Sequence, residues 1–311
     1  MKNLLPFGPG LVLLAGWLLT TPHMWAADKT PARIPVLLDT DIGDDIDDAF
    51  ALALVLQSPE LDLRGVTTVF GDAHTRALLV CRLLHGVGRD DIPVASGSPP
   101  RARPEIRGQF QYALRPCFRN RPVRESAVEF LYKQLKARPG KLTLLAVGPL
   151  TNMSSLLRKH PNCKPWIKRI VLMGGAVRVG YKNKPPVEVE WNIKCDIKAA
   201  QTVFQSGVPL VVAPLDATTS LKLEEARRNR LFATGTALTW QLQALYQLWD
   251  QPTPTLFDPV AAALCFEEKF CTLEPLRLEV DDRGFTRPVK GKPNARVAMS
   301  IRRPEFLNWL V

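Results

Sequence analysis

The sequence predicts an α/β fold with an open, mostly parallel central sheet and helices on both of its faces. Short aliphatic runs alternate along the 311 residues with longer stretches of helical pattern, which is the order that strand-helix-strand units produce. The first run, Ile34–Thr40, is aliphatic along most of its length, as is typical of a parallel strand covered on both faces. A cluster of aspartates directly after this run predicts a polar site at the carboxyl end of the sheet, where such folds bind ligands.

The remaining elements follow in a regular order. A helix with apolar residues all round is predicted over residues 47–59, where a Ser-Pro pair ends it. Two alternating runs near the C-terminal end predict an antiparallel hairpin, and a proline-rich stretch predicts a long loop or insertion. Further strands are predicted over residues 63–71, 142–149, 167–176 and 208–216, further helices over residues 75–84, 150–161, 197–207 and 257–266, and the loop over residues 99–122.

Residues 1–27 resemble a secretory signal peptide. Lys2 precedes an apolar stretch over residues 11–19, and Ala26 and Ala27 supply the small residues of a cleavage site. The apolar stretch is short for a membrane span. We therefore expect a protein that is exported and then released from this segment.

The expected organisation is a signal peptide over residues 1–27 and a single domain over residues 28–311. The chain is long enough for one large domain with a complete core. We expect the mature protein in the periplasm or outside the cell, with no stable insertion into a membrane. An uncleaved anchor is the alternative, because Met24 or Trp25 would occupy a position where a small residue is usual.

Composition narrows the class of protein further. The net charge is +11, but no nucleic-acid-binding motif accompanies it, so we expect no nucleic-acid partner. Six cysteines are present; their spacing matches no zinc pattern, and they are too sparse for a disulfide scaffold. Cys265 and Cys271 are close enough in sequence to pair, with buried thiols as the alternative.

The stretch "LLDTDIGDDIDDAFAL" at residues 37–52 holds six aspartates within ten positions. Two carboxylates about 4 Å apart repel by about 4 kcal/mol at an effective dielectric of about 20. A helix N-terminus returns only about 0.3–1 kcal/mol per anion. Converging carboxylates must therefore diverge into water, take up protons or bind a hard cation. Oxygen ligands suit Ca²⁺ or Mg²⁺ rather than zinc, so we predict a metal site at this turn.

Four later segments repeat the pattern of a strand end followed by polar residues. They are "TTVFGD" with Asp72, "AVGPLTN" with Asn152, "EVEWNIKCD" with Glu190 and Asn192, and "LFDPVA" with Asp258. Each segment alone is weak, because an Asp-Pro pair is often only a helix cap. Together, in this order after "DTDIGDDIDDA", they resemble the nucleoside hydrolase family, in particular its bacterial branch with this motif. The resemblance extends from about residue 34 to the C-terminus and includes "VLMGGA", which contains Met173.

The resemblance implies an activity and a site. The activity is hydrolysis of the N-glycosidic bond of ribonucleosides to free base and ribose, with a Ca²⁺-bound water as nucleophile and an aspartate as general base. The cofactor is Ca²⁺, the partner is a small-molecule nucleoside, and we expect a homo-oligomer. The implied metal ligands are Asp41, Asp48, Asp258 and the carbonyl of Val147. The catalytic candidates are Asp41 and Asp45, and the substrate-binding candidates are Asp47, Asp72, Met173, Glu190, Trp191 and Asn192.

The sequence departs from the common family pattern at two places. Three residues instead of one separate Gly43 from the paired aspartates that begin at Asp47, so either Asp41 or Asp45 could be the base. Several members carry His before the last aspartate, where this chain has Phe257. The proton for the leaving base must then come from another group or from solvent, or stacking must assist departure. The candidates for these roles are His74, Trp191, Trp240, Tyr246 and Trp249.

Two other functions remain open at this point. A Mg²⁺-dependent phosphohydrolase of the haloacid dehalogenase type also begins with a strand followed by "DxD", and its nucleophile would be Asp39. A Ca²⁺-dependent periplasmic nucleoside- or sugar-binding protein without hydrolase activity would retain the same metal ligands. The later segments favour the nucleoside hydrolase over the phosphohydrolase.

Overall fold

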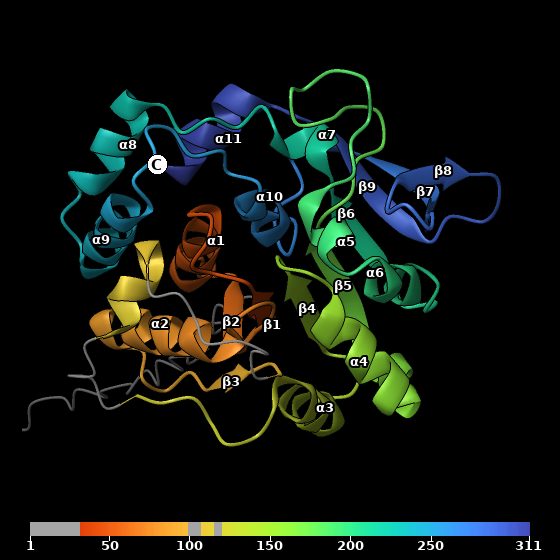
Figure 1. Ribbon diagram of the computed structural model, residues 1–311, viewed down its shortest axis with the longest axis horizontal. Coiled ribbons are helices and arrows are strands. Elements are labelled where there is room, and N and C mark those ends of the chain that lie inside the picture. The colour runs from red at the N-terminus through yellow and green to blue at the C-terminus, as the bar shows by residue number, and fades with distance from the viewer. Residues whose placement is uncertain (1–31, 99–106, 115–119) are drawn as a thin grey trace, which may run out of the picture. The chain divides into compact units, whose positions relative to one another are not determined.

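The strands of the described residues form one nine-stranded sheet in the order β3-β2-β1-β4-β5-β6-β9-β7-β8 (Figure 1). Every neighbouring pair from β3 to β9 is parallel, whereas β7 runs antiparallel to both β9 and β8. The predicted mostly parallel sheet and the predicted C-terminal hairpin, β7 and β8, are therefore confirmed. The strands are β1 (Ile34–Thr40), β2 (Leu61–Thr68), β3 (Val94–Ser96), β4 (Leu142–Ala146), β5 (Ile167–Met173), β6 (Leu210–Ala213), β7 (Cys271–Val280), β8 (Thr286–Val289) and β9 (Ala295–Ile301).

This computed structural model describes residues 32–98, 107–114 and 120–311. The predicted signal peptide, much of the proline-rich stretch 99–122 and Cys117 lie outside the described residues. Residues 33–311 group as one compact unit. No helix among the described residues is long and apolar enough to cross a membrane.

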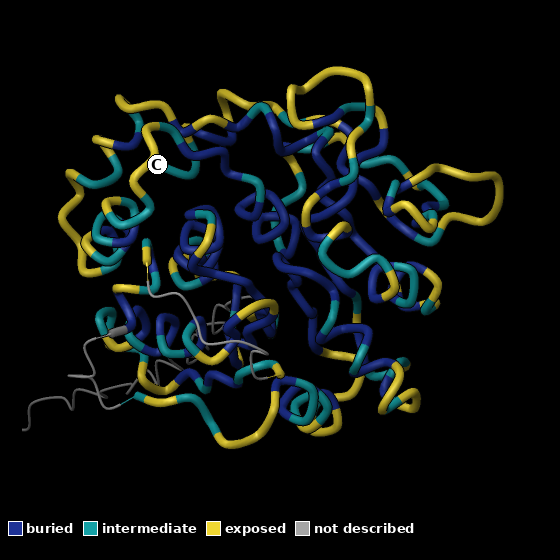
Figure 2. Tube along the Cα trace, viewed as in Figure 1, coloured by how far each residue is buried: buried dark blue, intermediate teal, exposed yellow. Residues whose placement is uncertain are grey.

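Helices cover both faces of the sheet, as predicted. One hydrophobic cluster joins the sheet to α1, α2, α9, α10 and α11, and a second joins it to α3, α4 and α6 (Figures 1 and 2). The helices are α1 (Asp47–Gln57), α2 (Ala73–Gly86), α3 (Ala127–Ala137), α4 (Thr151–Lys159), α5 (Trp191–Cys195), α6 (Ile197–Phe204), α7 (Leu215–Thr218), α8 (Glu225–Phe232), α9 (Ala237–Trp249), α10 (Asp258–Ala263) and α11 (Arg303–Leu310), with 3-10 helices η1 (Gly108–Leu114) and η2 (Pro161–Trp166).

Strand β1 lies in the middle of the sheet and contributes to both cores. Leu37 belongs to one hydrophobic cluster, and Val36 and Leu38 belong to the other, because successive side chains of a strand point to opposite faces. The burial seen along β1 in Figure 2 explains its aliphatic sequence. The parallel neighbours β2 and β4 then bring the carboxyl ends of three strands to the same edge.

The turn between β1 and α1 needs an unusual backbone at Gly43. Its φ is +126°, and a Cβ atom there would lie 2.7 Å from a ring carbon of Phe110. Glycine is therefore required both for the conformation and for the contact with η1. The turn delivers Asp47 and Asp48 into the first turn of α1, where both are buried.

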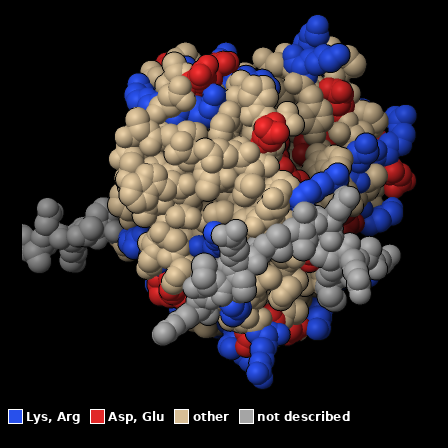
Figure 3. All heavy atoms as spheres, turned by 60° about the vertical axis from the view of Figure 1, so that its left-hand side comes forward, with Lys and Arg blue, Asp and Glu red and all other residues tan. Residues whose placement is uncertain are grey.

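Two expectations from the composition, one about cysteine pairing and one about the distribution of charge, can be compared with the described residues. Cys265 and Cys271 are both free thiols, so the possible pairing was wrong. Cys265 follows α10 and is buried in the hydrophobic cluster that contains this helix, and Cys271 begins β7. On the face drawn in Figure 3, Lys and Arg side chains form separate groups around a broad uncharged area. The net positive charge is thus distributed on that face rather than gathered in one patch.

Candidate active site

A cavity of about 270 Å³ lies at the carboxyl ends of the central strands. Ten of the eleven residues predicted for the site line this cavity, and they come from segments far apart in the sequence. Parallel strands place their carboxyl ends at one edge, which explains how these segments meet. The lining residues are Asp41, Asp44, Asp45, Asp47, Asp48, Val147, Met173, Tyr181, Glu190, Trp191, Asn192, Phe257 and Asp258.

Three buried carboxylates converge in this cavity. Oxygen atoms of Asp47, Asp48 and Asp258 lie within 4.8 Å of one another, and each side chain is nearly inaccessible to solvent. The backbone N–H of Asp258 donates to Asp47 over 3.2 Å, and the hydroxyl of Thr40 donates to Asp48. Burial raises the pKa of all three carboxyl groups well above the usual range, and the negative charges of neighbouring aspartates raise it further.

This donor set fits a hard cation. The three groups offer only oxygen atoms, and the pKa shifts show that they resist being ionised together. A cation with oxygen ligands would remove that repulsion. The residues therefore satisfy the chemical requirement for a site of the Ca²⁺ or Mg²⁺ type, without distinguishing between the two ions.

Asp41 lies beside this cluster at the end of β1. Burial raises the pKa of its carboxyl group to about 7; the Arg76 charge lowers it, whereas the Asp44 and Glu190 charges raise it. The start of "GPLTN" packs directly against it, since a Cβ atom on Gly148 would lie 2.7 Å from an Asp41 carboxylate oxygen. Glycine at position 148 is therefore needed for β4 to approach the Asp41 carboxylate.

Asp44 and Asp45, the two acidic residues between Gly43 and Asp47, lie in different environments. The Asp44 carboxylate is bound by Arg76 over 2.6 Å, and 56% of its side chain is exposed. The Asp45 carboxylate accepts the backbone N–H of Ile46 over 2.7 Å. Burial raises the pKa of Asp45, and the Lys222 charge opposes this. Asp45 is therefore the more desolvated of the two.

Asn192 and the carbonyl of Val147 are in contact. The side-chain amide of Asn192 donates to the Val147 carbonyl over 2.9 Å and to the Met173 carbonyl over 3.3 Å. The amide thus ties together the ends of β4 and β5. A carbonyl oxygen has two lone pairs, so Val147 can accept this bond and still face an ion.

Glu190 is the N-cap of α5. Its carboxylate accepts backbone N–H groups of Asn192, Ile193 and Gly175 over 2.8, 3.1 and 3.0 Å. Burial raises the pKa of Glu190, although these hydrogen bonds lower it. The side chain therefore shapes the cavity wall and caps the helix. Its contact with a substrate stays a prediction.

Aromatic side chains form the outer wall. The Trp191 side chain is 52% exposed, and its backbone N–H donates to the Tyr181 hydroxyl over 2.7 Å. The Tyr181 ring meets Phe257 edge-on at 6.2 Å, and Phe70 meets Trp191 edge-on at 6.3 Å. A flat ligand such as a nucleobase could contact this wall.

Several residues considered from the sequence lie elsewhere. Asp72 caps α2 by accepting the backbone N–H of Thr75 over 3.1 Å, and it lines a neighbouring cavity rather than this one. His74 is exposed on α2. The aromatic residues on α9 also lie outside the cavity lining: Trp240, Tyr246 and Trp249. Stacking by those three side chains is therefore not supported.

Sequence reasoning missed Tyr181 and Arg76. Tyr181 lies in the irregular segment between β5 and α5, where no periodic pattern marks it. Arg76 carries a sequence signal, because it is a charged residue on the same helix face as the apolar residues Val80 and Leu84. All three side chains are buried.

Asp39 bears on the phosphohydrolase alternative. It is fully buried and accepts hydrogen bonds from Thr67 over 2.6 Å and from Asn152 over 2.8 Å. It does not line the acidic cavity. A nucleophile must reach its substrate, so the position of Asp39 does not support that reaction.

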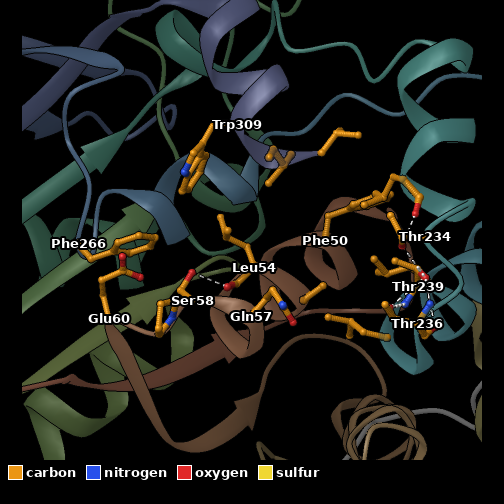
Figure 4. A pocket seen from close by; sticks show the side chains of 17 residues that line it. Phe50, Leu54, Gln57, Ser58, Glu60, Thr234, Thr236, Thr239, Phe266 and Trp309 are labelled. Atoms are coloured by element: carbon orange, nitrogen blue, oxygen red, sulfur yellow. Dashed lines mark hydrogen bonds between the residues drawn. The ribbon is translucent and has the colours of Figure 1, made fainter. Parts of the chain in front are cut away.

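A second cavity has a different character. It measures about 400 Å³ and lies between α1, α9 and α11, with side chains such as Phe50, Leu54 and Trp309 around it (Figure 4). Among the described residues that line it, Glu60 is the only one with an acidic side chain. This cavity lacks the converging oxygen ligands of the first, so the acidic cavity is the candidate active site.

Known proteins resemble this chain over most of its length. A family model described as inosine-uridine preferring nucleoside hydrolase matches residues 36–308. The chain is similar to the pyrimidine-specific ribonucleoside hydrolase RihA of Citrobacter koseri, with 35% identity over 308 residues that cover 89% of this chain and 96% of the relative. RihA of Salmonella arizonae is 33% identical over 308 residues, which cover 89% of this chain and 97% of that protein.

Solved structures share the fold. A plant nucleoside hydrolase matches with a TM-score of 0.78 at 24% identity, and the match covers 90% of this chain and 98% of the plant enzyme's chain. A purine-preferring ribonucleoside hydrolase from Gardnerella vaginalis has a TM-score of 0.77 at 24% identity and covers 89% of this chain and 96% of its own. The predicted open α/β architecture is thereby confirmed.

Proposed function

The chain belongs to the inosine-uridine preferring nucleoside hydrolase family and is an N-glycosyl hydrolase of ribonucleosides, and from this premise we propose how its own residues carry out the reaction. The proposal is that Asp48, Asp258 and the Val147 carbonyl hold Ca²⁺, with Asp41 beside them as ligand and general base. The observation that carries it is the convergence of Asp47, Asp48 and Asp258 within 4.8 Å in a buried cavity. The family assignment disfavours both alternatives, the phosphohydrolase and the binding protein without activity.

Calcium is proposed over zinc because of the ligand chemistry. The cavity offers carboxylates and a carbonyl, without a cysteine or histidine among its described lining residues. Such oxygen sets suit Ca²⁺. When bound, Ca²⁺ supplies positive charge that orients the ribose hydroxyls and makes a nearby water more acidic.

Asp41 is proposed as the group that accepts the proton of the attacking water. Its carboxyl group lines the acidic cavity directly after β1, and the charge of a bound cation would keep it ionised and able to accept a proton. Asp45 is the alternative base, because it lines the same cavity. Asp41 is preferred because its charge acts more strongly than that of Asp45 on the proposed ligands Asp48 and Asp258.

The sugar is proposed to bind over the acidic cluster. One Asp47 oxygen accepts the backbone N–H of Asp258, which leaves its other oxygen for a ribose hydroxyl. Asn192 and Glu190 line the same cavity and are fixed by their hydrogen bonds to backbone groups. A dense carboxylate environment stabilises the positive charge that develops on the sugar as the glycosidic bond breaks.

The base is proposed to leave against the aromatic wall. Because the Tyr181 hydroxyl accepts from the Trp191 backbone, its own proton remains free to donate to a substrate atom. Desolvation raises the pKa of Tyr181, so the hydroxyl stays protonated and acts as a hydrogen-bond donor rather than as a strong acid.

Base preference is proposed to favour purines. The relatives from Citrobacter koseri and Salmonella arizonae are named pyrimidine-specific, whereas the Gardnerella vaginalis enzyme is named purine-preferring. Those names point in opposite directions. The proposal therefore rests on Phe257, which supplies no proton, and on the aromatic surface formed with Trp191.

We also propose that residues 1–27 are removed and that the mature enzyme works in the periplasm or outside the cell as a homo-oligomer. The support for export is the sequence of that segment. Amino-terminal sequencing of native protein should find a start near Ala27. An intact Met1 in a cytosolic fraction would disprove export.

The reaction and the metal are tested together. Purified protein should release ribose and free base from inosine, lose this activity after EDTA treatment, and regain it with Ca²⁺. Release of phosphate from a sugar phosphate, or nucleoside binding without ribose release, would contradict the proposal. Recovery with Zn²⁺ but not with Ca²⁺ would contradict the choice of ion alone.

A further inference from the structure

Arg76 is a charged side chain buried next to the catalytic turn. It lies in the first turn of α2, and only 2% of it is exposed. Its Nε donates to the Phe70 carbonyl over 2.9 Å. One terminal nitrogen donates to the carbonyls of Asp41 and Ile42, the latter over 2.9 Å. The other donates to the Asp44 carboxylate over 2.6 Å.

Burial of a guanidinium group is unfavourable unless its donors are satisfied. Here all three nitrogens have acceptors, and the group also lies 5.2 Å from the Phe110 ring centre and 6.0 Å from that of Phe70. An apolar residue would fill the same space without this desolvation cost. The arrangement therefore has a purpose beyond packing, and the groups it contacts indicate what that purpose is.

Those groups lie on two segments next to residues that line the acidic cavity. Asp41, Ile42 and Asp44 form the long turn between β1 and α1. The Phe70 ring meets Trp191 on the aromatic wall. Gln109, which is buried, supports the same turn by donating to the Asp45 carbonyl over 2.8 Å. Arg76 alone among these groups contacts both the turn and the Phe70 segment.

We propose that Arg76 is a positioning residue for the hydrolase reaction: it holds Asp44 at the rim shared by the acidic cavity and the neighbouring cavity, and so fixes the turn that carries Asp41 and Asp45 into the acidic cavity. The inference rests on the proposed function in taking the Asp41 carboxylate as the reacting group. It assigns Asp44 the role of an anchor, bound to Arg76 and neither a metal ligand nor a base. It also makes the Phe70 and Trp191 wall depend on the same guanidinium group.

The test is removal of the side chain and rescue by free guanidinium. A cavity of about 620 Å³ borders Arg76, which gives a small cation access to the vacated space. Arg76→Ala should lower kcat for ribose release by about 10²-fold, as expected for a misplaced reacting group, with KM changed by less than about threefold. Guanidinium chloride at millimolar concentration should raise the kcat of Arg76→Ala at least about tenfold, because it restores the position of the reacting group.

Arg228→Ala is the matched control. Arg228 is also buried, donates to the Leu223 carbonyl and lies over the Tyr246 ring at 4.8 Å, but it does not line the acidic cavity. Below its melting temperature this variant should retain kcat and gain nothing from guanidinium. If guanidinium restores activity to Arg76→Ala but has no effect on Arg228→Ala, the lost activity is due to the position of the active-site turn rather than to general stability.

Arg76→Lys and Asp44→Asn provide a second route if Arg76→Ala does not fold. Lysine keeps the charge but lacks the planar fork, so Arg76→Lys should remain at least about tenfold slower than wild type. Asp44→Asn should lose much less activity than Asp41→Asn. A folded Arg76→Ala with wild-type kcat, or a loss that guanidinium does not relieve, would overturn the inference. So would an Asp44→Asn variant as inactive as Asp41→Asn. Failure of wild-type enzyme to release ribose would instead contradict the proposed function.

Discussion

The backbone N–H of Asp258 donates a 3.2 Å hydrogen bond to the carboxylate of Asp47, across 211 positions of sequence. Both residues begin helices, Asp47 in α1 and Asp258 in α10, and these helices share one hydrophobic core. The acidic cluster therefore forms only when the two ends of the domain pack together. Binding of an ion at this junction would stabilise the fold as well as the site.

We predict that Asp48→Ala and Asp258→Ala each abolish the stabilisation by Ca²⁺. For the wild type, Ca²⁺ at about 100 times its Kd should add about 2.7 kcal/mol to the free energy of unfolding, which corresponds to a rise in Tm of several degrees. Thermal melts after EDTA treatment, with and without Ca²⁺, measure this rise. Asp282→Ala is the control, because the Asp282 side chain is 87% exposed. Stoichiometric zinc by elemental analysis, or an unchanged wild-type Tm, would contradict the prediction.

We predict that removal of the ion makes stability fall as pH rises. Burial raises the pKa of Asp39 and of Asp41 to about 7, whereas an unfolded aspartate titrates near 4. Between about pH 4 and pH 7 the native state therefore holds more protons than the unfolded state, so the free energy of unfolding decreases with pH. The Tm of EDTA-treated protein should be lower at pH 8 than at pH 5.

Calcium provides the control for this pH dependence. Because an ion competes with protons for the carboxylates, the gain in Tm on adding Ca²⁺ should be larger at pH 8 than at pH 5. Asp41→Asn removes one of the titrating groups and should flatten the profile of the EDTA-treated protein. A Tm that does not fall from pH 5 to pH 8 without Ca²⁺ would contradict the raised pKa values of these carboxyl groups.

The sequence was sufficient for the fold and for most of the site because the informative residues lie at strand ends. Asp41, Val147 and Met173 each follow or end a strand, and β1, β4 and β5 are neighbours in the sheet. Once the alternation of strands and helices predicted a parallel sheet, these positions had to meet at one edge. Their roles with an ion and a substrate stay predictions.

The rest depended on contacts that no local pattern encodes. The strand predicted over residues 63–71 ends earlier, at Thr68, because Phe70 and Gly71 adopt positive φ angles. The same bend brings the Phe70 carbonyl to Arg76. Asp72 then caps α2 instead of lining the acidic cavity. These outcomes involve backbone conformations and tertiary contacts that no periodic pattern in the sequence specifies.

We predict that Asp41→Asn and Asp48→Ala both abolish ribose release, for different reasons. Asp48→Ala removes a proposed ligand and should lose the metal. Asp41→Asn keeps an oxygen donor and should retain the metal while kcat falls by about 10²–10⁴-fold, the usual contribution of a general base. Metal content and kcat measured on the same preparations separate the two effects. Near-full activity of Asp41→Asn together with an inactive Asp45→Asn would move the base to Asp45.

The last prediction concerns the leaving base and rests on the contact between Phe257 and Tyr181, whose rings meet edge-on at 6.2 Å in the cavity wall. Phe257 offers no proton, and a pyrimidine has a less basic ring nitrogen than a purine, so it depends more on a placed acid. A purine can accept a proton at N7 from solvent, and aromatic stacking worth about 1–3 kcal/mol can assist it.

We therefore expect kcat/KM for inosine to exceed that for uridine by roughly tenfold or more, since about 1.4 kcal/mol corresponds to a factor of ten. Phe257→His should introduce an acid and raise the value for uridine more than that for inosine. Tyr181→Phe is the companion variant: it removes only the hydroxyl beside Phe257, and it should slow both substrates if that hydroxyl donates to the substrate. Equal hydrolysis of uridine and inosine by the wild type, with a pH profile that shows one protonated group near neutrality, would mean that another acid serves the leaving base and that Phe257 does not set the preference.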